Sequence, residues 1–291
     1  MKRIALIFTC FLINVFCIFS QENKITKVFV LAGQSNMEGA ADALDLTEVD
    51  LEDLKIAQKN ILLAYNGSKP KPLHVTIPAD WKKKKYKLDS CFGPEIFFGI
   101  QLSKKYPNQK FLFIKRSEGG TSLYGCWNPD WTEEKAKYVG ELDKPKLFQE
   151  LMDYSDEILS KYDKNDYNIE GMLWVQGESD SGKKWGPLPS ETYYDNLKLL
   201  INKSRYHFSY KDMPFMILQV GGGKVVQAMK RLGNEMNNVS FIPQSKDPYS
   251  FNYLARYGKD RDKHGNHYNY YGMKKIGVLF SKEFVNKYSR K

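Results

Sequence analysis

Short apolar runs alternate along this chain with longer segments whose apolar residues recur at helical spacing. The apolar runs are rich in Val, Ile, Leu and Phe, as is typical of strands buried on both faces of a parallel sheet. The pattern predicts such strands at 28–32, 111–115, 172–176, 215–220 and 239–243.

The intervening segments are predicted as helices at 92–105, 147–162, 191–201, 225–236 and 271–287. The first is entered through Gly93-Pro94-Glu95, which places proline and an acid in the first turn, and Ser190 is predicted to cap the third. This alternation predicts an α/β fold with a central parallel sheet between two helical layers. Residues 41–90 fit the pattern poorly and are interpreted as a long excursion of loops that shape the site.

The first twenty residues differ from the rest. Lys2 and Arg3 precede an apolar run from Ile4 to Phe19, and the chain turns polar at Gln21. A charged start followed by a short apolar stretch is typical of a secretory signal peptide and is short for a membrane span. We therefore predict a signal peptide at 1–20, a single domain at 21–291, and a secreted or periplasmic protein without stable membrane insertion.

Composition limits the remaining classes of function. Hydrophobic residues make up 42% of the chain, which is enough for a full core, and the net charge is +10. The run KKKKYK at 82–87 is interpreted as a solvated face, and no basic stripe with interleaved aromatic residues predicts nucleic-acid binding. Cys91 and Cys126 follow the signal segment; an oxidising compartment would permit a disulfide, but sequence does not give their separation.

Polar and glycine-rich segments follow the predicted strands. The carboxyl ends of parallel strands meet at one sheet edge, where open α/β folds bind their ligands. The segments are GQSNM at 33–37, EGGT at 118–121, QGESD at 176–180 and GGG at 221–223, and DKHGNHYNYYG precedes the last helix at 262–272.

Acyl transfer needs a nucleophile, a base and donors for an oxyanion. Ser35 follows a strand on a tight turn and is the candidate nucleophile. The chain has four histidines, of which His264 and His267 lie in the loop before the last helix and are preferred as base over His74 and His207. The candidate donors for the oxyanion are the N–H of Ser35, an N–H of Gly119 or Gly120, and the Gln176 amide, and the candidate acids are Asp262, Glu178 and Asp180.

Five blocks carry a resemblance to a known family: LAGQSNMEG, FGPE, IKRSEGGTS, WVQGESD and HYNYYGMKKIG. In this order, from residue 31 to 277, they resemble the SGNH/GDSL hydrolases, and within them the carbohydrate esterase family six and sialate O-acetylesterase domain group. The resemblance implies a flavodoxin-like three-layer fold. It also implies removal of acetyl groups from sugar hydroxyls without a cofactor. We expect an acetyl-enzyme intermediate, and no metal site, because the His-x-x-His pair at 264–267 lacks the helical spacing of zinc motifs.

The resemblance also implies roles for residues that match the blocks. Ser35 matches the nucleophile, and Gly119, Gly120 and Gln176 match positions that hold the oxyanion, with Gln34 as a further oxyanion or substrate contact. His267 matches the catalytic histidine. The superfamily places an acid three residues before this histidine, but that position is His264 here. Glu178 is therefore predicted to orient His267, with Asp262 as the alternative acid.

Two other functions stay open at this point: a carbohydrate-binding protein that has lost catalysis, and a short-chain carboxylesterase. The expected partner is an acetylated carbohydrate, for which acetylated xylan, another plant glycan and O-acetyl sialic acid all remain candidates. The sequence specifies neither the sugar nor the oligomeric state.

Overall fold

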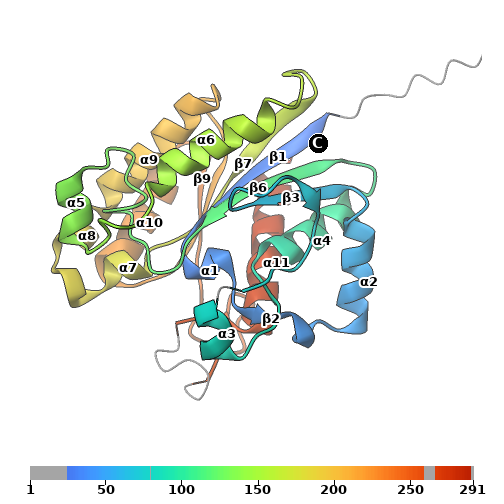
Figure 1. The fold of residues 1–291 in the computed structure, drawn as a ribbon, viewed down its shortest axis with the longest axis horizontal. Coiled ribbons are helices and arrows are strands. Elements are labelled where there is room, and N and C mark those ends of the chain that lie inside the picture. The colour runs from blue at the N-terminus through green and yellow to red at the C-terminus, as the bar shows by residue number, and fades with distance from the viewer. Residues whose placement is uncertain (1–24, 79, 259–265, 290–291) are drawn as a thin grey trace, which may run out of the picture.

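A computed structural model of the protein describes residues 25–78, 80–258 and 266–289. The predicted signal peptide, Asp262 and His264 lie outside the described residues. A seven-stranded sheet forms the centre of the structure, in the order β4-β3-β6-β1-β7-β8-β9 (Figure 1). Its strands are β1 (Thr26–Gly33), β3 (Ile61–Tyr65), β4 (Lys71–Pro72), β6 (Phe111–Ser117), β7 (Tyr167–Val175), β8 (Phe215–Leu218) and β9 (Val239–Ile242).

The sheet confirms the predicted strands and their parallel arrangement. All five predicted runs are strands, and β1 pairs in parallel with β6 on one side and β7 on the other. Without β3 and β4, the order β6-β1-β7-β8-β9 is the second-first-third-fourth-fifth order of flavodoxin-like folds. The chain therefore changes direction across the sheet at β1, which places the end of β1 at the switch point.

Helices cover both faces of the sheet (Figure 1). One layer contains α2 (Glu48–Ala57), α4 (Glu95–Lys105) and α11 (Tyr270–Lys287), and the other contains α6 (Leu147–Leu159), α9 (Tyr193–His207) and α10 (Gly223–Glu235). The short elements are α1 (Ser35–Glu38), β2 (Ala41–Asp42), η1 (Ala43–Asp45), α3 (Asp80–Tyr86), β5 (Cys91–Phe92), α5 (Glu133–Tyr138), α7 (Glu178–Ser181), η2 (Lys183–Trp185) and α8 (Leu188–Glu191). No helix among the described residues combines the length and apolar character that a membrane span requires.

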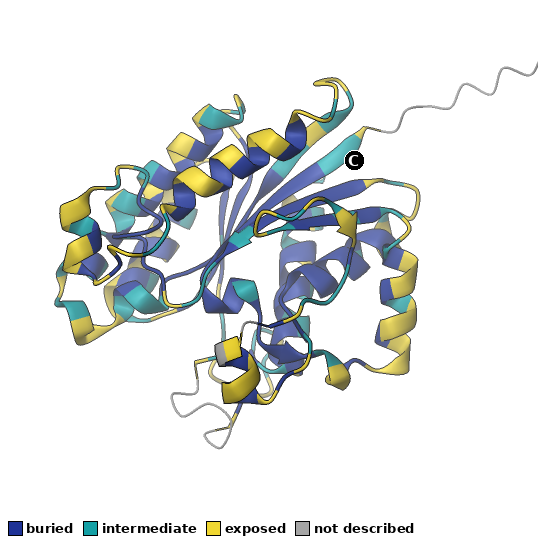
Figure 2. Cartoon of the chain, in the orientation of Figure 1, coloured by how far each residue is buried: buried dark blue, intermediate teal, exposed yellow. Residues whose placement is uncertain are grey.

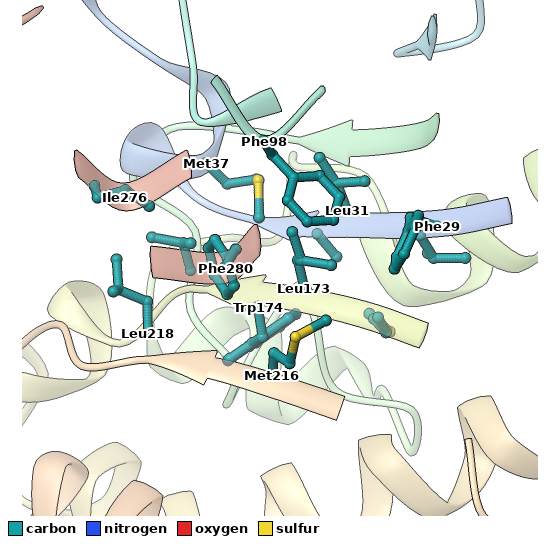
Figure 3. Close-up of a cluster of buried hydrophobic side chains, with 14 of the residues drawn as sticks. Phe29, Leu31, Met37, Phe98, Leu173, Trp174, Met216, Leu218, Ile276 and Phe280 are labelled. Carbon is teal, nitrogen blue, oxygen red and sulfur yellow. The ribbon is translucent and has the colours of Figure 1, made fainter. Parts of the chain in front are cut away.

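The hydrophobic core lies between the sheet and its helices. Phe29 of β1 makes edge contacts with Phe98 of α4 at 4.9 Å and Phe284 of α11 at 4.8 Å between ring centroids. Figure 3 shows side chains of β1 and β7 meeting Ile276 and Phe280 of α11. The strands are buried along most of their length, whereas the helices expose their outer faces (Figure 2). Burial of one such side chain stabilises the fold by about 1.5–3 kcal/mol.

Two local predictions were wrong. The excursion at 41–90 contains a helix, α2, and a strand of the main sheet, β3, which pairs with β6. The apolar run of β3 is short, and its place in the sheet depends on a partner some fifty residues away. Ser190 lies inside α8 and donates to the Pro187 carbonyl instead of capping α9, because the chain makes a separate helical turn first.

A fully buried ion pair joins three elements next to the end of β1. Lys115 of β6 and Glu95 of α4 have no exposed side-chain surface, and Lys115 Nζ lies 2.5 Å from Glu95 Oε2. Lys115 Nζ also donates to the Glu38 carbonyl at 3.2 Å, and the Gly93 N–H donates to Glu95 Oε1 at 3.0 Å. Burial lowers the pKa of Lys115. Breaking such a pair leaves an uncompensated buried charge.

We expect Lys115→Met to lower the free energy of unfolding by about 3–5 kcal/mol, because Glu95 loses its partner in the core. The matched control is Lys224→Met, which breaks an exposed pair with Glu191 and should cost less than about 1 kcal/mol. Urea unfolding measures both. Adding Glu95→Gln to Lys115→Met should recover part of the loss; equal losses in the two lysine variants would contradict this account.

Candidate active site

Ser35 stands at the start of α1, directly beyond the carboxyl end of β1. The turn into α1 requires glycine at position 33, where φ is +154° and a Cβ would collide with the Val175 carbonyl of β7. Ser35 is 7% exposed, and the short helix is buried through Met37. The predicted position of Ser35 on a tight turn directly after a strand is confirmed, but the residue is buried and not exposed at the sheet edge.

Gln34 connects the end of β1 to the start of α7. Its side-chain oxygen accepts from Gln176 Nε2 at 3.3 Å, from the Gly177 N–H at 3.4 Å and from the Ser179 N–H at 3.3 Å. Its amide nitrogen has no hydrogen-bond partner among the described residues. This side chain therefore fixes the β1 and β7 loops relative to each other and keeps a donor for a ligand.

Asn36 holds the segment that carries His267. Its Nδ2 donates to Glu178 Oε1 at 2.6 Å and to the Asn266 carbonyl at 3.0 Å, and its Oδ1 accepts from the Tyr268 N–H at 3.4 Å. The last two contacts lie immediately before and after His267 in the chain. The residue that follows the candidate nucleophile therefore brackets the candidate base, a link that the sequence analysis missed.

His267 is half-buried and bonded on two sides. Its Nδ1 lies 2.7 Å from the Tyr86 hydroxyl, and its carbonyl accepts from the Tyr257 N–H at 3.0 Å. The structure contains no hydrogen bond between the Ser35 hydroxyl and His267, so these two residues are connected through Asn36. Ligand-free enzymes commonly hold such catalytic pairs at longer distances than the Michaelis complex does.

Glu178 enters the site but does not touch the histidine. Its Oε1 accepts from Asn36, and its buried Oε2 has no hydrogen-bond partner among the residues that the structure describes. Burial raises the pKa of Glu178, and the Asn36 hydrogen bond acts in the opposite direction. The predicted hydrogen bond, in which Glu178 accepts the Nδ1–H of His267, is not present: Glu178 Oε1 accepts from Asn36, and Nδ1 of His267 faces the Tyr86 hydroxyl.

Gln176 was predicted to donate to the oxyanion, but its contacts leave no free amide hydrogen. It has no exposed surface, and its Nε2 donates to Asp180 Oδ2 at 2.6 Å and to the Thr121 carbonyl at 3.1 Å. Asp180 in turn accepts the N–H groups of Leu123 and Tyr124 at 2.8 and 3.0 Å. This buried network fixes the loop after β6, which carries Gly119 and Gly120, to the start of α7.

The glycine loop after β6 presents unbonded N–H groups. Gly120 is exposed at φ +68°, and its carbonyl accepts from Lys144 Nζ at 2.7 Å. Thr121 donates its hydroxyl to the Glu118 carbonyl, which closes the turn. Within the described residues, the N–H groups of Gly119, Gly120 and Ser35 have no hydrogen-bond partner, as an oxyanion site requires.

The basic run at 82–87 corrects an expectation. Lys83 to Lys85 are exposed, as a solvated face requires, but Lys82 is only 1% exposed. Lys82 Nζ lies 2.7 Å from Glu38 Oε1 and donates to the Gly39 carbonyl at 2.6 Å. One residue of the run therefore faces inward and holds the end of α1.

The other candidates lie elsewhere. His74 contacts the Pro72 carbonyl, and His207 pairs with Asp156. Cys91 and Cys126 are free, buried thiols, and burial raises the pKa of each. The described part of the chain contains no cluster of three or more His, Cys, Asp or Glu side chains that could hold a metal ion.

Residues 25–286 match the family described as carbohydrate esterase, sialic acid-specific acetylesterase. The chain belongs to this family. The match includes Ser35, the glycine loop and His267, and it supports a carbohydrate esterase with an acetylated carbohydrate substrate. The comparison with curated protein sequences gave no match.

Solved structures show the same fold as this esterase family member. A protein from Arabidopsis thaliana aligns at a TM-score of 0.62 and 19% identity, covering 91% of this chain and 99% of that chain. NanS aligns at 0.62 and 14% identity, covering 90% and 98% of the two chains. A carbohydrate acetylesterase from Xanthomonas citri aligns at 0.55 and 11% identity, covering 90% of this chain and 56% of that longer one. At these identities, the likeness shows that these proteins share the α/β fold with a central, mostly parallel sheet.

The Asp180 network predicts a pH dependence of stability. Burial raises the pKa of Asp180 to about 7, so the folded protein holds a proton there that the unfolded chain releases near its ordinary value of 3.8. A raised carboxyl pKa means that stability from this group declines as pH rises from about 4 to about 7 and is then constant. The difference in unfolding free energy between wild type and Asp180→Asn should follow this course in urea titrations at several pH values. A pH-independent difference would contradict it.

Proposed function

We propose that the protein is a secreted carbohydrate O-acetylesterase that uses Ser35 as its nucleophile. The observation that carries the proposal is Asn36, which follows Ser35 in α1 and binds the backbone on both sides of His267. This arrangement brings a serine at a sheet edge and a histidine from a distant loop into one site, in a chain that matches a carbohydrate esterase family over residues 25–286.

In the proposed reaction, Ser35 Oγ attacks the acetyl carbonyl carbon while His267 Nε2 takes the hydroxyl proton. The carbonyl oxygen becomes an oxyanion, held by the N–H of Ser35, an N–H of Gly119 or Gly120, and the amide nitrogen of Gln34. The carbon–oxygen bond to the sugar then breaks, and His267 returns the proton to the departing sugar oxygen. Water, deprotonated by His267, then attacks the carbonyl carbon of the acetyl-serine. The bond to Ser35 Oγ breaks, His267 returns the proton to Oγ, and acetate leaves.

Glu178 and Gln176 hold in place the residues that carry out this chemistry. Glu178 Oε1 accepts from Asn36 Nδ2 at 2.6 Å and so orients the Asn36 amide. Asn36 in turn binds the backbone next to His267 and helps to position it. Gln176 anchors Asp180 and the Gly119–Gly120 loop. Neither needs to touch the substrate. Asp262, the alternative acid, lies outside the described residues and is tested by substitution below.

The signal segment at 1–20 supports secretion, where the substrate would be an acetylated glycan. The solved relative from Xanthomonas citri is named as a carbohydrate acetylesterase, which supports an acetyl ester on a sugar. A panel of acetylated xylan, other acetylated plant glycans and O-acetyl sialic acid, assayed by acetate release, identifies the sugar.

Ser35→Ala and His267→Gln should each lower kcat for 4-nitrophenyl acetate by about 10³-fold or more, because the nucleophile or its base is lost. Wild type should also react with a fluorophosphonate probe, and Ser35→Ala should not. The matched control is Ser68→Ala, outside the site. Full activity in Ser35→Ala would contradict the mechanism, and glycan binding without labelling or turnover would indicate a binding protein.

Glu178→Gln should lower kcat about tenfold, because the neutral side chain keeps an acceptor for Asn36 but loses the charge that strengthens the hydrogen bond. Asn36→Ala should lower it further, since both backbone contacts beside His267 disappear. Steady-state kinetics on the preferred acetyl ester measures both. Full activity in Glu178→Gln together with loss in Asp262→Asn would assign the acid to Asp262 instead.

A further inference from the structure

One face of the short helix α3 points into the site. Lys82 and Tyr86 lie four residues apart, one helical turn, and each is 1% exposed, whereas the three lysines between them are exposed. Lys82 reaches Glu38 and the Gly39 carbonyl at the end of α1. Tyr86 reaches His267. A single helix from the 41–90 excursion therefore contacts both the nucleophile helix and the base.

The contact between Tyr86 and His267 has the geometry of an orienting hydrogen bond. The hydroxyl oxygen lies 2.7 Å from Nδ1, and the two ring planes are inclined at 65° with centroids 5.5 Å apart. The ring of Tyr86 thus meets the imidazole by its hydroxyl and not by its face. This places a hydrogen-bonding group on Nδ1, one of the two ring nitrogens of His267.

We propose that Tyr86 is a positioning residue for His267, its hydroxyl oxygen accepting the Nδ1–H and leaving the Nε2 lone pair for the Ser35 proton. The proposal rests on the function proposed above. A neutral imidazole carries its single proton on one nitrogen or the other, and only the Nδ1–H tautomer can act as a base through Nε2. An acceptor at Nδ1 selects that tautomer and fixes the ring orientation, which is the task of the acid in serine triads.

The surroundings hold the Tyr86 hydroxyl in place. The Tyr257 ring stacks on Tyr86 with centroids 5.8 Å apart and planes inclined at 20°. The Tyr257 hydroxyl donates to the Ala40 carbonyl at 2.8 Å and accepts from the Asp42 N–H at 3.2 Å, just beyond α1. Tyr86 is therefore held, through Tyr257, by the segment that follows α1. The positions of the base and of the nucleophile depend on the same segment.

The test compares Tyr86→Phe with Tyr154→Phe. Tyr154 lies on α6, and its hydroxyl donates to the Ser68 carbonyl, so the control also removes one tyrosine hydroxyl bond. Tyr86→Phe should lower kcat for the acetyl ester about 10- to 100-fold with little change in KM, because orientation of the base affects the transition state and not ground-state binding. Tyr154→Phe should leave both unchanged.

The pH profile distinguishes positioning from a structural role. An acceptor at Nδ1 stabilises the imidazolium, so its removal makes His267 harder to protonate. The acid limb of kcat/KM should therefore shift to lower pH in Tyr86→Phe. A purely structural defect lowers the rate and leaves the limb where it is.

A second readout does not depend on activity. Nitrogen-15 NMR of protein labelled at its four histidines reports the tautomer of each ring, and His267→Gln assigns the signal. Wild type should show His267 protonated at Nδ1 at neutral pH, and Tyr86→Phe should shift the population toward Nε2–H. This measurement on wild type alone suffices if Tyr86→Phe does not fold.

The proposal is overturned if wild-type His267 is protonated at Nε2, or if Tyr86→Phe retains the wild-type rate, pH limb and NMR signal. Failure of the proposed function looks different: Ser35→Ala would keep activity, or wild type would have none, while the NMR signature of the Tyr86–His267 bond persists.

Discussion

The position of the four-residue helix α1 determines the rest of the site. Gly33 allows the chain to turn at the end of β1, and the side chains of Gln34 and Asn36, on either side of Ser35, bind different partners. Gln34 binds the loop after β7 and Asn36 binds the His267 segment, whereas the Ser35 side chain between them makes no hydrogen bond to any described residue. Both neighbours of Ser35 are thus hydrogen-bonded to surrounding loops. These bonds hold the Ser35 backbone in place and leave its hydroxyl available for the reaction.

Charge stabilises the other end of α1. Lys115 donates to the Glu38 carbonyl, and Lys82 binds the Glu38 carboxylate and the Gly39 carbonyl. Cations near helix carboxyl ends are favourable, because the last carbonyls lack intrahelical partners. Lys115 is fully buried, and its charge is compensated by Glu95 of α4, which lies outside the site. The ion pair with Glu95 offsets the free-energy cost of removing the Lys115 ammonium from water. The rigidity of Ser35 therefore depends on an ion pair that takes no part in the chemistry.

The structure of the 41–90 segment could not be predicted from the local sequence pattern alone. Its apolar content was sufficient for β3, yet strand pairing with β6 is a contact between distant residues that periodicity does not encode. The same holds for α3, whose run of lysines reads as a solvated face. Lys82 is buried because Glu38 and Gly39 supply partners for its ammonium group, and those partners are visible only once the chain is folded.

The sequence by itself determined the parallel sheet, the edge at which the polar loops gather, and Ser35 and His267 as the residues to examine. The sheet and its edge follow from hydrophobic periodicity and from the rule that parallel strands present their carboxyl ends together, whereas Ser35 and His267 were singled out by the sequence blocks that resemble the esterase family. Only the tertiary structure decided which side chains touch. It paired Glu178 with Asn36 instead of His267, committed the Gln176 amide to Asp180, and brought Tyr86 to Nδ1 of His267. A hydrogen bond requires its donor and acceptor atoms to lie about 2.7–3.2 Å apart. When the two residues are distant in the chain, their spacing along the sequence does not indicate whether this condition is met.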